Sequence, residues 1–245
     1  MPVDLANPRG HDVNLRSAPL QRQYEAIVAR IAGDAPGRVL DWGSGYGQIS
    51  HLLKEARVDV TAFDYWPDAE VDGFRPLERY PDVEAYFSSD PRRLPFDDGS
   101  FDAVLSCGVL EHVEDPDASL EEIKRVLVPR GSLYVYKLPN RASYLEWIAR
   151  RIGLYHHGAY PNDRVYGRRT AIDLLDRHGF EVLEFRRMNM LPLSLPGRLA
   201  ARTAGPLWAL NRALSRVPVL NLLATDLELI AAAPGGRQRE SEDRP

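Results

Sequence analysis

A carboxylate followed by three alternating glycines is the first feature of this sequence that suggests chemistry. The run Asp41-Trp42-Gly43-Ser44-Gly45-Tyr46-Gly47 has the spacing Asp-x-Gly-x-Gly-x-Gly. Apolar residues before the run and a helical pattern after it predict a strand, a tight turn and a helix N-terminus. An open α/β sheet receives a nucleotide-like ligand at such a turn. The spacing is not the Gly-x-Gly-x-x-Gly of dinucleotide enzymes. Because an acidic residue leads the turn, we expect a ligand with a cationic amino group rather than a pyrophosphate.

A second carboxylate, Asp64, ends the next predicted strand, 23 positions after Asp41. At this distance a carboxylate can accept hydrogen bonds from both ribose hydroxyls of a ligand bound over the first turn. The alternative is a strand-end aspartate that caps a turn. Tyr65 and Trp66 follow, and either could stack on a purine or simply pack.

Further motifs follow in order along the chain. Asp90 precedes Leu94-Pro95-Phe96, Ser100-Phe101-Asp102 opens a buried strand, and Val109-Leu110-Glu111-His112-Val113 comes after that strand. Together with Asp41 and Asp64, these motifs cover about residues 37–138. They resemble the class I S-adenosylmethionine-dependent methyltransferases, in the subgroup called methyltransferase type 11. The resemblance implies S-adenosylmethionine as cofactor and S-adenosylhomocysteine as product. It also implies a Rossmann-like α/β fold: a seven-stranded, mostly parallel sheet of order 3-2-1-4-5-7-6, with one antiparallel edge strand and helices on both faces.

The resemblance also implies roles for individual residues. Asp41 would meet the ammonium group of the cofactor, Asp64 would hold the ribose, and Asp90 would accept from the adenine amino group. Pro91 departs from the pattern because it has no backbone N–H to offer to the adenine ring. The expected cofactor-binding residues are Asp41, Gly43, Gly45, Tyr46, Asp64, Tyr65, Asp90, Pro91, Ser106 and Cys107.

Methyl transfer from a sulfonium is an in-line displacement that depends mainly on positioning and exclusion of water. An oxygen nucleophile still benefits from a base, and we expect His112 or His157 to serve as one. A structural role is the alternative for His112, while the adjacent pair His156-His157 lies with Tyr155 and Tyr160 where such enzymes build the acceptor pocket. Two adjacent histidines without further Cys or Glu spacing predict no metal site.

Charge is unevenly distributed along the 245 residues, whose formal net charge is −4. Residues 140–216 hold 13 Arg and Lys against 6 Asp and Glu, a net of +7, so the rest carries about −11. The overall balance argues against a nucleic-acid partner. The basic second half indicates either an anionic substrate or surface, or a solvated Arg-rich face. The single cysteine and the absence of an apolar signal segment favour a cytoplasmic protein, with peripheral contact at the inner face of a membrane left open.

Alternating strand and helix patterns predict βαβ units interrupted by insertions. The expected organisation is an N-terminal arm (1–16) and helix up to residue 36, a cofactor-binding core (37–139), a substrate-side insertion (140–167), a continuation of the core (168–187), an amphipathic cap insertion (188–224), a last core strand (225–233) and a disordered tail (234–245).

The cap insertion supports two interpretations. Arginines at 198, 202, 212 and 216 share one helical face, while Leu199, Leu207, Leu210, Leu214 and Val217 share another. We expect Gly205-Pro206 to divide the segment into two short helices. A leucine face packed on the core is the favoured interpretation, and a basic lid that touches lipid or a lipid-linked phosphate is the other.

Methyl transfer to oxygen, nitrogen or carbon of a small-molecule, lipid-linked or glycan-linked acceptor is therefore the predicted function. Two other classes remain open. One is a non-catalytic cofactor-binding protein that acts as a partner or membrane-surface module. The other is an NAD-dependent oxidoreductase, against which the glycine spacing argues.

Overall fold

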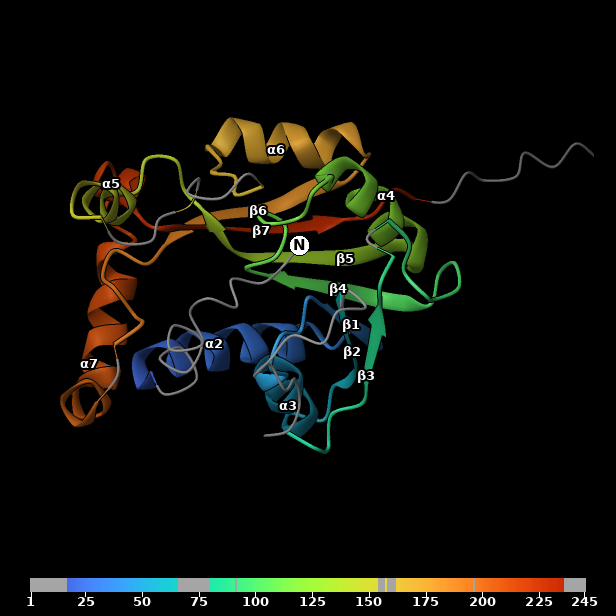
Figure 1. The fold of residues 1–245 in the computed structure, drawn as a ribbon, viewed down its shortest axis with the longest axis horizontal. Helices are drawn as coiled ribbons and strands as arrows, with labels where there is room; N and C mark the ends of the chain where they lie inside the picture. Colours follow the sequence, from blue (N-terminus) through green and yellow to red (C-terminus); the bar gives the residue numbers. More distant parts are fainter. Residues whose placement is uncertain are drawn as a thin grey trace, which may run out of the picture.

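A seven-stranded sheet of order β3-β2-β1-β4-β5-β7-β6 forms the centre of the protein, as the resemblance implies (Figure 1). The computed structural model describes residues 17–65, 80–90, 92–153, 157, 162–195 and 197–235. The strands are β1 (Arg38–Trp42), β2 (Asp59–Tyr65), β3 (Ala85–Ser88), β4 (Phe101–Cys107), β5 (Leu127–Pro139), β6 (Glu181–Met188) and β7 (Asp226–Ala232). The helices are α2 (Ala18–Asp34), α3 (Gln48–Glu55), α4 (Pro116–Val126), α5 (Tyr144–Arg151), α6 (Arg168–Arg177), α7 (Arg198–Leu214) and the 3₁₀ helix η1 (Leu220–Leu223).

Strand direction differs from the expectation at one point. β7 is antiparallel to both β5 and β6, so the antiparallel strand lies inside the sheet and β6 forms the edge. The sequence of β7 explains this position, because five of its seven residues are apolar and all five are buried. An edge strand would leave more of that surface in water.

Helices cover both faces of the sheet and form two hydrophobic cores (Figure 1). Leu120 and Ile123 of α4 and Leu174 of α6 pack on one face. Ile31 of α2 and Leu53 of α3 pack on the other. Helices α5 and α7 lie together at one end of the sheet. The strands and their two helical layers thus leave the carboxyl ends of β1, β2 and β4 at one edge.

The cap insertion contains one long helix, so the expectation of two short helices is wrong. α7 runs without interruption through Pro206. A proline in a helix removes one backbone hydrogen bond and bends the chain, but the turns on either side keep theirs. Packing of α7 against α2 holds the whole length in place.

Some expectations fall on residues outside the described part of the chain. These are the N-terminal arm at 1–16 and the segment from residue 236 onward in the expected tail. Among the described residues, no helix is long and apolar enough to cross a membrane.

Candidate functional site

A cleft of about 1560 Å³ opens at the carboxyl ends of the parallel strands. Its walls come from the glycine turn after β1, the ends of β2 and β4, helix α5 and the loop that follows β6. Ligands of open α/β sheets bind at this edge, because the loops after neighbouring strands converge there. The cleft therefore joins the predicted cofactor turn to the two insertions.

The glycine turn has the backbone conformation that its sequence predicts. Gly43, Gly45 and Gly47 have φ values of 79°, 55° and 79°, in the left-handed region that glycine favours. A Cβ on Gly43 would lie 2.3 Å from a methyl carbon of Val109, so that position is closed by packing. A Cβ on Gly45 would meet nothing within 4 Å. The space over Gly45 therefore belongs to the cleft, which Tyr46 also lines.

Asp41 is buried beneath the turn, with 2 % of its surface exposed. The hydroxyl of Ser50 donates a 2.5 Å hydrogen bond to its Oδ2. Burial raises the pKa of Asp41 to about 6, and the nearby Asp64 acts in the same direction while the Ser50 bond opposes it. A buried carboxylate that is costly to ionise favours a cationic partner.

Asp64 ties the second strand to the glycine turn. Its Oδ2 accepts from the N–H of Gly45 at 2.7 Å, and its Oδ1 accepts from the N–H of Tyr65 at 2.7 Å. Burial raises the pKa of this carboxyl group despite both bonds. Asp64 and Tyr65 both line the cleft, beside the turn.

The remaining predicted cofactor residues are less closely grouped. Asp90 is exposed at the rim of the cleft, where its Oδ1 accepts from the N–H of Arg92 at 2.8 Å. Cys107 lines the cleft, and burial raises the pKa of its thiol, which keeps it protonated. Ser106 is 1 % exposed, and within the described part of the chain its hydroxyl has no hydrogen-bond partner. Pro91 and Trp66 lie outside the described residues.

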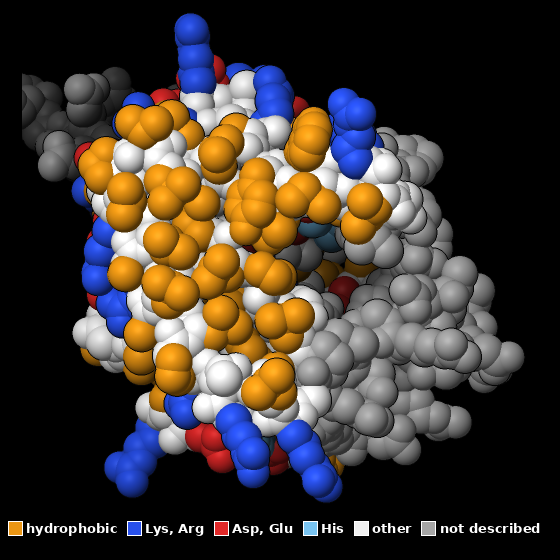
Figure 2. All heavy atoms as spheres, turned by 90° about the vertical axis from the view of Figure 1, so that its left-hand side faces the viewer, with side chains coloured by type: hydrophobic (Ala, Val, Ile, Leu, Met, Phe, Trp, Pro, Cys, Tyr) orange, Lys and Arg blue, Asp and Glu red, His pale blue; other side chains and the backbone are white. Residues whose placement is uncertain are grey.

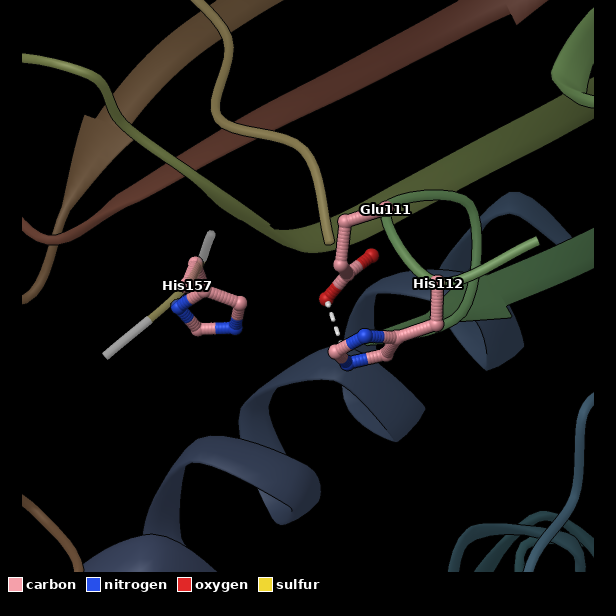
Figure 3. Close-up of side chains that lie close together, drawn as sticks. All are labelled: Glu111, His112 and His157. Carbon is pink, nitrogen blue, oxygen red and sulfur yellow. Dashed lines mark ion pairs between the residues drawn. The ribbon is translucent and has the colours of Figure 1, made fainter. Parts of the chain in front are cut away.

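Both predicted bases lie in the other half of the cleft, next to Glu111 (Figure 3). Asp163 meets Nδ1 of His112 at 2.8 Å, and Glu146 meets Nδ1 of His157 at 2.9 Å. The two imidazole rings stack with centroids 5.6 Å apart. The structure thus brings together a loop after β4 and an insertion after β5. His156, Tyr155 and Tyr160 lie outside the described residues.

The charges of this cluster depend on one another. Burial lowers the pKa of His157, but the hydrogen bond and charge of Glu146 outweigh burial and raise it. Burial raises the pKa of Glu111, which is 2 % exposed. The surroundings therefore favour the protonated forms of both His157 and Glu111.

Sequence reasoning missed several ionisable residues of the cleft, among them Glu111, Lys137 and Asp226. Glu111 belongs to the motif at residues 109–113, but the motif by itself predicts no role for this side chain. Lys137 lies in a bulge of β5 at a φ of 58°, and its Nζ is 5.5 Å from the ring centroid of Tyr24. Asp226 at the start of β7 accepts from Asn189 at 2.5 Å. A charged residue inside an apolar strand, as Lys137 is, was the signal available in the sequence.

Several buried polar atoms of the cleft wall have no hydrogen-bond partner within the described structure. They are Gln23 Oε1, Ser44 Oγ, Glu111 Oε2 and Thr225 Oγ1. Buried polar groups are normally paired, because an unpaired one costs about 1–3 kcal/mol. Unpaired atoms in the wall of a cleft fit a site that is completed by a polar ligand.

The leucine face of α7 does not pack on the core, contrary to the favoured expectation. Leu199 is 76 % exposed and Leu210 is 51 % exposed, and Ala204 and Asn211 are the buried residues of the helix. Figure 2, viewed from the end of the sheet where α5 and α7 lie, shows a broad apolar face beside a hollow, with Lys and Arg along its border. The helix lies at the end of the sheet, so its other faces have no layer to cover them.

Comparison with known proteins agrees with this architecture. A family model described as "Methyltransferase domain" matches residues 40–135. The demethylmenaquinone methyltransferase of Renibacterium salmoninarum is 33 % identical over 152 residues, which cover 59 % of this chain and 62 % of that protein. The chain therefore spans less than two thirds of that relative.

Two further similarities extend the agreement. The ubiquinone biosynthesis O-methyltransferase of Xanthomonas campestris pv. campestris is 32 % identical over 166 residues, covering 62 % of this chain and 68 % of that protein. The solved structure of a Burkholderia thailandensis 1,6-didemethyltoxoflavin-N1-methyltransferase, with bound 1,6-didemethyltoxoflavin and S-adenosylhomocysteine, has a TM-score of 0.57 and 20 % identity. The match covers 92 % of this chain and 83 % of the chain in that structure. By its sheet order, its glycine turn and these similarities, the chain belongs to the class I S-adenosylmethionine-dependent methyltransferases.

Proposed function

We propose that the protein transfers a methyl group from S-adenosylmethionine to a hydroxyl oxygen of a lipid-soluble aromatic acceptor. One observation carries the proposal. A single cleft contains both the glycine turn with its carboxylates and the cluster of Glu111, His112 and His157. The first half suits the cofactor, and the second suits an acceptor that must lose a proton.

The residues of the turn fit the cofactor. Asp41 would pair with the ammonium group, and Gly45 leaves room for the backbone to approach the methionine part. Asp64 would bind the ribose hydroxyls and Asp90 the adenine amino group. The unpaired oxygens of the cleft wall, including Ser44 Oγ, provide further polar contacts.

Bound S-adenosylmethionine supplies a methyl group on a positively charged sulfur, which leaves as a neutral thioether. The protein holds the acceptor oxygen in line with that methyl group and keeps water out. The acceptor hydroxyl gives its proton to the histidine cluster as the O–C bond forms. Asp163 and Glu146 orient His112 and His157 for this task, since each accepts from the Nδ1 side of its ring.

The acceptor class follows from the mouth of the cleft and from the relatives. Ile148 and Ile152 line the cleft and are also exposed on the apolar face. The names of two relatives refer to demethylmenaquinone and to the biosynthesis of ubiquinone. Both compounds are lipid-soluble quinones. We therefore propose that the apolar face rests on a membrane surface and that the acceptor enters from it.

A labelled methyl donor tests the function. The purified protein is incubated with S-adenosylmethionine carrying an isotopically labelled methyl group, together with either a bacterial lipid extract or the water-soluble extract. We expect label in an aromatic lipid, and at least about a hundredfold less of it with His157→Ala, since a positioned base contributes that much or more. His178→Ala, which removes an imidazole held by two carboxylates on the surface, should label normally.

Three results would contradict the proposal. Label confined to water-soluble products would exclude a lipid-soluble acceptor. Tight binding of S-adenosylhomocysteine in calorimetry without any labelled product would indicate a non-catalytic binding protein. Tight binding of NAD without binding of the adenosyl ligand would indicate an oxidoreductase.

A further inference from the structure

We infer that Glu111, His112 and His157 form a binding site for a divalent transition-metal ion. Each side chain offers one donor atom, and the three atoms lie within 4.8 Å of one another. In Figure 3 the carboxylate and the two rings surround one small space. The spacing of the histidines in the sequence predicts no such site, because His157 comes from an insertion far along the chain.

The outer contacts of the two histidines resemble those of metal-bound imidazoles. A ligating histidine usually gives its second ring nitrogen to a carboxylate, which sets the tautomer and the ring orientation. Here Asp163 engages Nδ1 of His112 and Glu146 engages Nδ1 of His157. The side chain of Asp163 is fully buried, so this contact is part of the fold rather than a surface ion pair. Both rings can then present Nε2 as the ligand atom.

Glu111 provides a second, independent observation. Its carboxylate is 2 % exposed, and Oε2 has no hydrogen-bond partner among the residues that the structure describes. The other oxygen, Oε1, is 3.8 Å from Nε2 of His112. A buried carboxylate oxygen without a partner is unfavourable. A cation between Glu111 and the two imidazoles would satisfy it.

The donor set selects a class of metal. Two imidazoles and one carboxylate suit Zn²⁺, Mn²⁺ or Fe²⁺ better than Mg²⁺ or Ca²⁺, which prefer oxygen ligands. Metal–ligand bonds of about 2.1 Å place tetrahedral donors roughly 3.4 Å apart. The three donor atoms must therefore move about an ångström closer to one another when the ion binds. Three protein ligands leave a coordination position open.

The open position gives the ion a role that rests on the proposed function. The cluster lines the same cleft as the glycine turn, so an acceptor hydroxyl could occupy the free position. A bound cation would lower the pKa of a coordinated O–H group, so the proton would leave to solvent while the two histidines hold the ion instead of acting as the base. The acceptor oxygen would then be ionised before it takes the methyl group.

Cobalt provides the test, because Co²⁺ bound by histidine and carboxylate ligands absorbs visible light. The protein, without an affinity tag and stripped of metal, is titrated with Co²⁺ and then with competing Zn²⁺. We expect one equivalent of bound Co²⁺. Asp163→Asn should weaken its binding about 10–100-fold, and Glu111→Gln and His157→Ala should weaken it further. His178→Ala is the matched control and should bind Co²⁺ normally, although His178 contacts both Asp117 and Glu121.

Two outcomes would overturn the inference. One is the absence of a visible Co²⁺ spectrum and of any displacement by Zn²⁺. The other is unchanged Co²⁺ affinity in both Glu111→Gln and His157→Ala. Calorimetry of the stripped protein with S-adenosylhomocysteine separates this failure from that of the proposed function. If the nucleoside binds and the metal does not, only the metal site is wrong.

Discussion

Carboxylates at the ends of neighbouring strands define the cofactor half of the cleft, yet their environments differ. Asp41 is buried beneath the turn, with Ser50 as its hydrogen-bond donor. Asp64 holds the backbone of Gly45 and Tyr65. The burial of Asp41 makes its charge costly, so binding of a cationic ammonium group should depend on the ionisation of this one residue.

The affinity for S-adenosylhomocysteine should therefore fall in acid. The pKa of Asp41 is raised to about 6, so the carboxylate is charged above that pH and neutral below it. At about pH 5 roughly a tenth of it is ionised, and we expect about tenfold weaker binding than at about pH 7.5. Calorimetry across this range measures the effect.

Asp41→Asn should bind weakly at every pH and lose the dependence. Asp59→Asn is the control, because Asp59 is an exposed residue at the start of β2. This variant should retain the pH dependence. A pH profile of Asp41→Asn that matches the unsubstituted protein would assign the titration to another group.

At the scale of elements, one buried asparagine joins α7 to the loop after β6. Asn211 is fully buried, and its Oδ1 accepts from the N–H groups of Met190 and Leu191 at 2.6 and 2.9 Å. Its Nδ2 donates to Asn189 at 2.9 Å. Asn189 in turn donates to Asp226 in the cleft wall. The spacing of apolar residues in the sequence does not reveal Asn211, although this side chain holds α7 to the loop after β6.

Asn211→Ala should destabilise the protein by about 2–4 kcal/mol, because it leaves two buried N–H groups without an acceptor. Urea unfolding followed by circular dichroism gives the free energy of unfolding. Asn221→Ala is the control, since Asn221 is only partly buried and makes one long bond to Ser215 at 3.3 Å. Its cost should stay below about 1 kcal/mol. Equal costs for the two variants would argue against the anchor.

At the scale of the whole molecule, a broad apolar face lies beside a hollow and has Lys and Arg along its border (Figure 2). The exposed apolar residues of this face are Trp147, Ile148, Ile152, Leu195, Leu199, Leu210, Val217, Val219, Leu220, Leu222 and Leu223. Residues 141–153 and 197–223 contain seven arginines and one acidic residue, Glu146. An apolar face with basic surroundings is typical of proteins that bind an anionic membrane surface.

Vesicle binding tests the apolar face. Leu199→Ser combined with Leu210→Ser should weaken binding to phosphatidylglycerol–phosphatidylcholine vesicles at least about tenfold, because each buried leucine contributes about 1.5 kcal/mol or more. Leu183→Ser is matched in chemistry and lies on β6, where it is 53 % exposed. It should bind normally. Binding should also weaken with salt. Co-sedimentation that finds no difference between the two variants would place the membrane contact elsewhere.

The sequence by itself determined the half of the cleft that we propose for the cofactor. Asp41, the three glycines and Asp64 lie within two neighbouring strands and one turn, so their geometry follows from local backbone rules. The strand order follows from the resemblance, and alternating patterns locate most of the elements. The hydrogen bond that ties Asp64 to the turn joins residues only 19 positions apart in the chain.

Only the tertiary structure decided the half of the cleft that we propose for the acceptor. Periodicity shows which residues of α7 share a face, but not whether that face meets the core or water, and α7 at the end of the sheet leaves it exposed. The same applies to His157, which belongs to the insertion after β5 and yet lies next to Glu111 and His112 from the loop after β4. Contacts between distant segments depend on how layers pack, and packing is not encoded in any one stretch of sequence.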